Sequence, residues 1–183
     1  MKIFSIAATA LLASASLFGA GELSNRRAPG FALPDSKVQY HDLADYRGKI
    51  VLIDFIQTNC PNCQKLATVL EKMKDKYKDR VQVLTITNPP DNVNTVAKFI
   101  TDHKVTSPVL FDCGQMAAIY PKVSPQRPSI HLPHLFVVDQ NGQLRNDFSH
   151  SDATKDVFDG PGLQKEIDKL LAESTSKPAA NKK

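Results

Sequence analysis

Two segments in the first half of the chain are almost continuously apolar and rich in β-branched residues. Residues 50–56 have the sequence IVLIDFI, and residues 81–87 have the sequence VQVLTIT. Runs of this kind are typical of strands that are buried on both faces of a sheet. Between them, apolar residues recur at steps of three and four positions, which predicts an amphipathic helix over 61–77. The recurring positions are Leu66, Val69, Leu70, Met73 and Tyr77.

Shorter elements follow the second strand. Helical spacing of apolar residues predicts a helix over 93–103, and a short strand is predicted at 109–111. Residues 115–120 form a short predicted helix. The next segment, 121–133, is rich in proline and has no periodicity, and connections of that length are often functional.

The last apolar segments predict a hairpin and a closing helix. Residues 135–138 and 143–148 flank Asn141-Gly142, a pair that readily supplies the positive φ of a tight turn. The closing helix is indicated by Leu163, Ile167, Leu170 and Leu171. Because strands and helices alternate along the chain, the predicted fold class is α/β, with a central mixed β-sheet flanked by helices.

The two ends of the chain differ from this middle part. A charged start followed by an apolar run predicts a signal peptide over residues 1–20, or alternatively an uncleaved N-terminal anchor. Either one places the folded part outside the cytoplasm, periplasmic or secreted, and the anchor would allow transient membrane association. Residues 174–183 are polar and predict a disordered tail, which leaves a single domain over 28–173.

The charged residues give no indication of a nucleic-acid partner. The chain has 23 basic and 19 acidic residues, a formal net charge of +4. The basic residues are spread among acidic ones or gathered in the polar tail, which is typical of a solvated surface.

Chemistry is indicated by Cys60-Pro61-Asn62-Cys63, at the junction of the first strand and its helix. At the helix N-terminus, free N–H groups and the helix dipole favour a thiolate at Cys60, the predicted attacking thiol. Cys63, one turn along, is the predicted resolving thiol. The alternative, a structural zinc site, needs a second pair of ligands, and only Cys113 and five scattered histidines are available. We therefore expect neither a metal ion nor an external cofactor.

Asp54 is the only charged residue of the first strand. An isolated carboxylate in an apolar strand is costly unless its pKa rises. We interpret Asp54 as a buried proton acceptor that helps to deprotonate Cys63. The alternative is a strand-end residue paired with a lysine such as Lys49.

Several further motifs occur in a characteristic order. They are APGFALPD at 28–35, YRGK at 46–49, SPVLFD at 107–112 and LPHLFVVDQNG at 132–142. With the cysteine motif, they make the chain resemble the thioredoxin-like superfamily, in particular its extracytoplasmic TlpA/ResA-type thiol–disulfide oxidoreductases, which are AhpC/TSA-like redoxins. The resemblance implies a thioredoxin-like fold and exchange with protein thiols, with a separate redox-donor protein.

The resemblance also implies roles for single residues. Pro133 would be the cis-proline that lies against the two cysteines, and the backbone of Leu132 would pair with the substrate chain. Pro61, Asn62 and His134 would be further substrate contacts. Asp91 falls roughly where some relatives carry an active-site glutamate, although Pro89-Pro90-Asp91 also fits an ordinary turn.

The chain departs from the family in ways that concern its partner. The family's aromatic-rich segment before the first cysteine is replaced by Ile56-Gln57-Thr58-Asn59. His131 and His134 flank Pro133. They are interpreted as exposed loop histidines, the alternatives being tuning of the Cys60 thiolate or copper binding with both cysteines, as in SCO-type chaperones.

The third cysteine, Cys113, follows a predicted strand. We interpret it as an inert, small buried residue, with a third redox thiol as the alternative. Thr58 lies two residues before Cys60, but the proline that frames a peroxidatic cysteine is absent, so a thiol peroxidase is a lesser alternative. Taken together, the sequence predicts a thiol–disulfide oxidoreductase that acts as a reductase, with a copper chaperone and a thiol peroxidase as rival functions.

Overall fold

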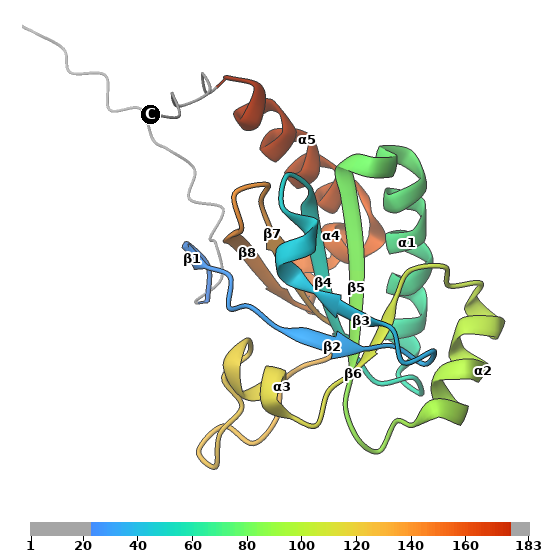
Figure 1. Cartoon of the computed structure of the whole chain (residues 1–183). Helices are drawn as coiled ribbons and strands as arrows, with labels where there is room; N and C mark the ends of the chain where they lie inside the picture. The colour runs from blue at the N-terminus through green and yellow to red at the C-terminus, as the bar shows by residue number, and fades with distance from the viewer. Residues whose placement is uncertain (1–22, 177–183) are drawn as a thin grey trace, which may run out of the picture.

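The computed structural model of the chain describes residues 23–176, so the predicted signal peptide lies outside the described residues. Figure 1 shows strands at the centre of the molecule with helices around them. The strands are β1 (Arg26–Arg27), β2 (Ala32–Pro34), β3 (Tyr40–Asp42), β4 (Ile50–Ile56), β5 (Val81–Thr87), β6 (Val109–Phe111), β7 (His134–Val138) and β8 (Gln143–Ser149). The helices are α1 (Pro61–Tyr77), α2 (Val93–His103), α3 (Gln115–Ile119), α4 (Lys155–Asp159) and α5 (Pro161–Ser176).

Six strands form one sheet in the order β1-β8-β7-β4-β5-β6, and β2 and β3 form a separate two-stranded sheet. Strand β5 pairs in parallel with both β4 and β6, whereas β7 runs antiparallel to both β4 and β8. The central mixed sheet flanked by helices is therefore confirmed. Because β4 and β5 are parallel, their carboxyl ends lie at the same edge of the sheet, where the chain continues from β4 into α1.

Strand β4 is buried along its whole length because both faces of the sheet are covered. Val51, Ile53 and Phe55 join a core cluster with residues of α3 and of the N-terminal segments. Ile50 and Leu52 point the other way, into a cluster formed with α1, α4 and α5. Each such side chain contributes about 1.5–3 kcal/mol through its removal from water. This two-sided burial explains why the segment is apolar at consecutive positions.

Helix α1 buries the side that its apolar spacing predicts. Pro61 occupies the first helical turn, where its missing N–H costs nothing. Helix α2 packs beside α1, and Val96 and Phe99 of α2 share a core cluster with Ala67 and Cys63 of α1. The buried residues of α1 are Cys63, Leu66, Ala67, Leu70, Met73 and Tyr77.

The structure differs from the sequence prediction at both ends of the domain. Strand β1 pairs with β8 through Arg26 and Arg27, so the sheet begins before residue 28, the predicted start of the domain. Helix α5 continues to Ser176, so the first residues of the predicted 174–183 tail are helical. Strands β1, β2 and β3 are absent from the prediction because two or three residues are too few to show an alternation.

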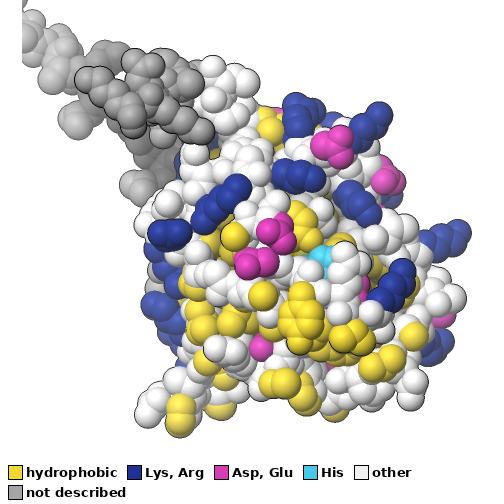
Figure 2. All heavy atoms as spheres, viewed as in Figure 1, with side chains coloured by type: hydrophobic (Ala, Val, Ile, Leu, Met, Phe, Trp, Pro, Cys, Tyr) yellow, Lys and Arg dark blue, Asp and Glu magenta, His cyan; other side chains and the backbone are white. Residues whose placement is uncertain are grey.

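Hydrophobic side chains gather on the face of the molecule that carries the β2–β3 hairpin, as Figure 2 shows. Val38 and Tyr40 of this hairpin are 75% and 65% exposed. The Lys and Arg side chains of this face are dispersed around its margins instead of forming one continuous patch. Among residues 23–176, no helix is both long and apolar enough to cross a membrane.

Candidate active site

The two cysteines of the CPNC motif lie where β4 gives way to α1. Cys60 is the N-cap of α1, with extended backbone (φ −81°, ψ 117°), and its Sγ accepts a hydrogen bond from the backbone N–H of Cys63 at 3.3 Å. Cys60 is half-buried, whereas Cys63 is 0% exposed. Pro61 is exposed and Asn62 is half-buried beside them. The two thiols are therefore unequal, because a partner protein can reach only Cys60 directly.

The environment of Cys63 keeps its thiol protonated. Burial is the largest cause of a raised pKa for this thiol, and a hydrogen bond with the Cys60 side chain and the charge of Asp54 raise the pKa further. The backbone N–H of Gln57 donates to the sulfur and lowers the pKa, but it does not offset the other causes. Since the thiolate is the nucleophile in disulfide exchange, Cys63 needs a proton acceptor before it can attack.

Asp54 lies within β4, between the strands that carry Thr85 and Leu135, and is 1% exposed. Its Oδ1 has no hydrogen-bond partner among the described residues, so the alternative of a carboxylate paired with Lys49 is wrong. Burial raises the pKa of Asp54 well above its usual range. Its effect on the pKa of the Cys63 thiol shows that the two groups interact electrostatically. A carboxyl whose pKa is raised in this way is a stronger base than an exposed aspartate.

The side chains of Asp91 and Gln64 hold the loop before Cys60. The sequence did not predict this role for either residue. The Asp91 carboxylate accepts hydrogen bonds from the Thr58 backbone N–H, at 2.9 Å, and from the Thr58 hydroxyl. The Gln64 side-chain amide donates to the Thr58 carbonyl at 2.8 Å. Asp91 is thus engaged with the loop and is not a free carboxylate facing the sulfurs.

The peptide bond between Leu132 and Pro133 is cis, as the family resemblance implies. Pro133 is buried directly before β7, and Leu132 and Cys60 both pack against the core cluster that contains Cys63. The Pro133 carbonyl accepts a hydrogen bond from the backbone N–H of His150. The proline loop, separated from the CPNC motif by about 70 residues of sequence, therefore borders the dithiol.

The two histidines around Pro133 have different environments. His131 is exposed, as predicted. His134 is the first residue of β7 and is 7% exposed, so its interpretation as an exposed loop histidine is wrong. Its ring stacks on Phe136 at 4.6 Å between centroids, and its Nδ1 is 3.1 Å from the Ser149 hydroxyl. The His134 side chain is buried because it packs between β8 and the Phe136 ring. The sequence around His134 resembles a loop and therefore did not predict this burial.

Two hollows border the site. One, of about 390 Å³, adjoins the loop before Cys60 and is lined by Thr58, Asn59, Gln64, Thr95, Lys98, Phe99, Asp102 and His103. The other, of about 440 Å³, adjoins the cis-proline loop and is lined by Leu23, Pro121, Arg127, Ser129, Ile130, His131, His134, Asp147 and Ser149.

Neither the third cysteine nor the histidines extend the site to a metal centre. Cys113 is exposed beyond the end of β6, so the interpretation of a buried residue is wrong. Across residues 23–176, no group of three or more His, Cys, Asp or Glu side chains is arranged to hold a metal ion. A copper site built from both cysteines and His134 has no counterpart in this arrangement, because the His134 ring is engaged by Ser149 and Phe136.

A thioredoxin-like α/β sheet with a helix-capping dithiol beside a cis-proline defines the class of protein. The AhpC/TSA family matches residues 25–147, and the chain belongs to this family. The match runs from β1 into β8 and includes both cysteines and the cis-proline.

Individual relatives agree with this assignment. The thiol-disulfide oxidoreductase ResA of Geobacillus kaustophilus (strain HTA426) is 29% identical over 131 residues, 71% of each chain. The thioredoxin-like protein YneN of Bacillus subtilis (strain 168) is 25% identical over 153 residues, 82% of this chain and 80% of that protein. A crystal structure of a Chlorobium tepidum protein described as a thiol:disulfide interchange protein DsbE superposes with a TM-score of 0.66 at 25% identity, covering 81% of this chain and 97% of that one. The predicted class, a ResA-type thiol–disulfide oxidoreductase, is confirmed.

Proposed function

We propose that the protein reduces disulfides of partner proteins outside the cytoplasm through the Cys60/Cys63 dithiol. The observation that carries this proposal is the asymmetry of the two thiols. Cys60 is accessible at the N-terminus of α1, and Cys63 is fully buried one turn along. An accessible nucleophile beside a buried resolving thiol is the arrangement that dithiol exchange needs.

Reduction proceeds in two exchange steps. The Cys60 thiolate attacks one sulfur of the partner's disulfide, so that a mixed disulfide forms and the partner's other sulfur leaves as a thiolate. Cys63 then loses its proton and attacks the Cys60 sulfur. The Cys60–Cys63 disulfide forms, and the second partner thiolate is released. Two electrons pass to the partner, and a separate donor dithiol protein must return the Cys60–Cys63 pair to its reduced state.

Asp54 is the proton acceptor in the second step of this proposal. Its raised pKa makes it a stronger base than an exposed aspartate, and its charge already acts on the Cys63 thiol. Pro133 and the backbone of Leu132 border the dithiol and would align the partner chain across Cys60. Exposed Pro61 and half-buried Asn62 would contact the same chain. The ring of His134 is mostly buried but lines the hollow beside the cis-proline loop, where it would contact a side chain of the partner.

The location and the direction of the reaction rest on separate arguments. Residues 1–20 have the pattern of a signal peptide, which supports export, and an uncleaved anchor would add membrane association. The direction towards reduction rests on the resemblance to the TlpA/ResA-type branch and depends on the potential of the dithiol.

The test is turnover of a protein disulfide in both directions. With excess small-molecule dithiol, the wild-type chain should accelerate reduction of insulin, and it should oxidise a reduced, unfolded protein only poorly. Cys63→Ala should trap a mixed disulfide through Cys60, and Cys60→Ser should trap none. Faster oxidation than reduction would reverse the proposed direction. Consumption of hydrogen peroxide by Cys60 without any mixed disulfide would instead favour a peroxidase.

A further inference from the structure

Thr58, two residues before Cys60, has every backbone and side-chain polar group bound. Its N–H and hydroxyl both donate to Asp91, and its carbonyl accepts from Gln64. The residue is buried although it belongs to a loop. A loop residue that is fixed by three hydrogen bonds has little conformational freedom.

The loop that contains Thr58 also holds both sulfurs. The N–H of Cys60 donates to the Gln57 carbonyl at 3.0 Å, which closes a tight turn over residues 57–60. The N–H of Gln57 donates to the Cys63 sulfur, and the Cys63 N–H donates to the Cys60 sulfur. Any displacement of the turn therefore changes the position of one sulfur relative to the other.

Asp91 connects this turn to a different element of the fold. It lies between β5 and α2, directly before Asn92, the N-cap of α2. Its Oδ1 also accepts a hydrogen bond from the Thr95 hydroxyl at 3.1 Å. That hydroxyl accepts from the Asn92 N–H within the capping box of α2. The carboxylate thus bridges the first turn of α2 and the turn before Cys60.

We propose that Asp91 is a positioning residue that holds Cys60 in line for attack by Cys63. This inference rests on the proposed dithiol exchange and extends it to the step that closes the Cys60–Cys63 disulfide. Because closure joins two groups of one chain, its rate depends on how well the sulfurs are held in geometry. The first attack, by Cys60 on an external disulfide, depends far less on that geometry.

A small aromatic disulfide that releases a coloured thiolate separates the two steps. The Cys60 thiolate attacks it, forms a mixed disulfide and releases the first coloured thiolate in a bimolecular step. Cys63 then loses its proton, attacks the Cys60 sulfur and releases the second thiolate in a unimolecular step. The two releases are followed by stopped-flow absorbance on full-length wild type, Asp91→Ala, Asp91→Asn and Thr58→Val. Asp75→Asn, an exposed carboxylate on α1, is the matched control.

Asp91→Ala should slow the second release by about tenfold or more, the loss that displaced reacting groups and a missing charge-assisted hydrogen bond produce. The first release should change by less than about threefold, since Cys60 remains accessible. Asp91→Asn keeps one acceptor oxygen and should be milder, and it carries the same test where Asp91→Ala does not fold. An unchanged second step, or equal slowing of both steps, would overturn the positioning role. Failure of wild type to release a second thiolate would instead overturn the proposed function.

Discussion

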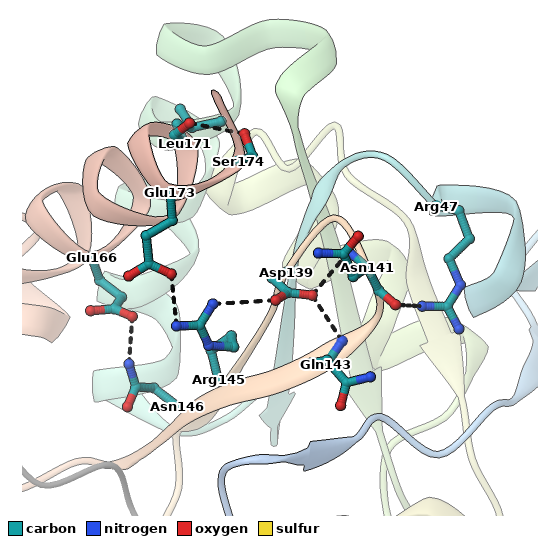
Figure 3. A network of polar contacts seen from close by, with 10 residues as sticks. All are labelled: Arg47, Asp139, Asn141, Gln143, Arg145, Asn146, Glu166, Leu171, Glu173 and Ser174. Atoms are coloured by element: carbon teal, nitrogen blue, oxygen red, sulfur yellow. Dashed lines mark hydrogen bonds and ion pairs between the residues drawn. The ribbon is translucent and has the colours of Figure 1, made fainter. Parts of the chain in front are cut away.

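Two buried aspartates, Asp54 and Asp139, lie toward opposite ends of the central sheet and have contrasting surroundings. Asp139 follows β7 at the end remote from the dithiol and is 7% exposed. Its Oδ1 accepts hydrogen bonds from the backbone N–H groups of Asn141 and Gln143, both at 2.9 Å, and its Oδ2 pairs with Arg145 at 3.3 Å. Figure 3 shows this network continuing through Arg145 to Glu173 of α5. Asp54 has no comparable partner for its Oδ1.

The residues around the two aspartates also differ in how many of their buried polar atoms lack a hydrogen-bond partner. Five buried side-chain polar atoms lack a hydrogen-bond partner among the described residues. Three belong to residues near the carboxyl ends of β4 and β5, namely Asp54, Thr87 and Asn88, whereas a fourth, His134 Nε2 at the start of β7, lies 3.5 Å from the Asp147 carboxylate. Unsatisfied buried groups cost stability, and they occur where chemistry needs them. The polar groups around Asp139 are thus satisfied, whereas several buried polar groups at the dithiol end are not.

The largest expected effect comes from removing the nucleophile at the dithiol end. Cys60→Ser should lower the rate of disulfide exchange by about a thousandfold or more, because a hydroxyl is not appreciably ionised near neutral pH. The unfolding free energy should change little, since Cys60 is half-buried. Insulin reduction and urea denaturation measure the two quantities. Residual exchange within tenfold of wild type would contradict the role of Cys60.

At the end of the sheet remote from the dithiol, substitution of Asp139 should lower the unfolding free energy without changing the rate of disulfide exchange. Asp139→Ala removes the acceptor of two backbone N–H groups and the partner of Arg145. It should lower the unfolding free energy by about 2–3 kcal/mol, the range for hydrogen bonds to a charged group. Asp75→Ala is the control for loss of an exposed carboxylate. A change in exchange rate larger than the control's, with the protein still folded, would show that the two ends are coupled.

A smaller effect, with a distinctive pH dependence, is expected for Asp54→Asn. Because burial raises the folded-state pKa of Asp54 above the ordinary value of about 3.9, the stability that protonated Asp54 contributes is complete below that value. It is lost as the pH rises through the folded-state pKa. Asp54→Asn should therefore flatten the decline of stability with rising pH.

The same substitution should slow the Cys63-dependent step by about tenfold or more, because a proton acceptor is lost. Urea denaturation between acid and mildly alkaline pH measures the stability profile, and the release of the second coloured thiolate measures the step. A pH profile identical to that of wild type would mean that Asp54 does not titrate with a raised pKa.

The smallest effect is expected for an exposed ion pair. Lys155 and Asp159 interact at successive turns of α4, with side chains 67% and 55% exposed. Solvent screening and side-chain entropy leave such pairs with almost no net contribution. Lys155→Ala should leave both thermal stability and exchange rate unchanged. A clear fall in melting temperature would show that α4 depends on this contact.

The elements of the sheet and the dithiol could be predicted from sequence because their signals are local. Residues of β4 are apolar at consecutive positions since both faces are covered, and α1 shows helical spacing because one side is buried. The position of Cys60 at the start of α1 follows from these two patterns. Asp54 was identified for the same reason, as the one charge in an apolar run.

The contacts that depend on tertiary packing could not be predicted in this way. His134 becomes buried because β8 and the Phe136 ring cover it, and nothing in the residues beside it indicates this. Thr58 and Asp91 are 33 residues apart in sequence, and they meet because the parallel pairing of β4 with β5 places the loops after the two strands side by side. The turn predicted at Pro89-Pro90-Asp91 is therefore present, but the turn pattern did not indicate the hydrogen bonds between Asp91 and Thr58.

The central claim, a reversible Cys60/Cys63 redox couple, is tested most directly by its reduction potential. The full-length chain is equilibrated in thiol–disulfide buffers of graded potential, and free thiols are quantified, with Cys63→Ala as the control that cannot form the pair. A reversible two-electron couple near the thioredoxin value of about −270 mV is the predicted result. A couple near about −120 mV would make the protein an oxidase. The absence of any reversible couple would contradict the dithiol mechanism altogether.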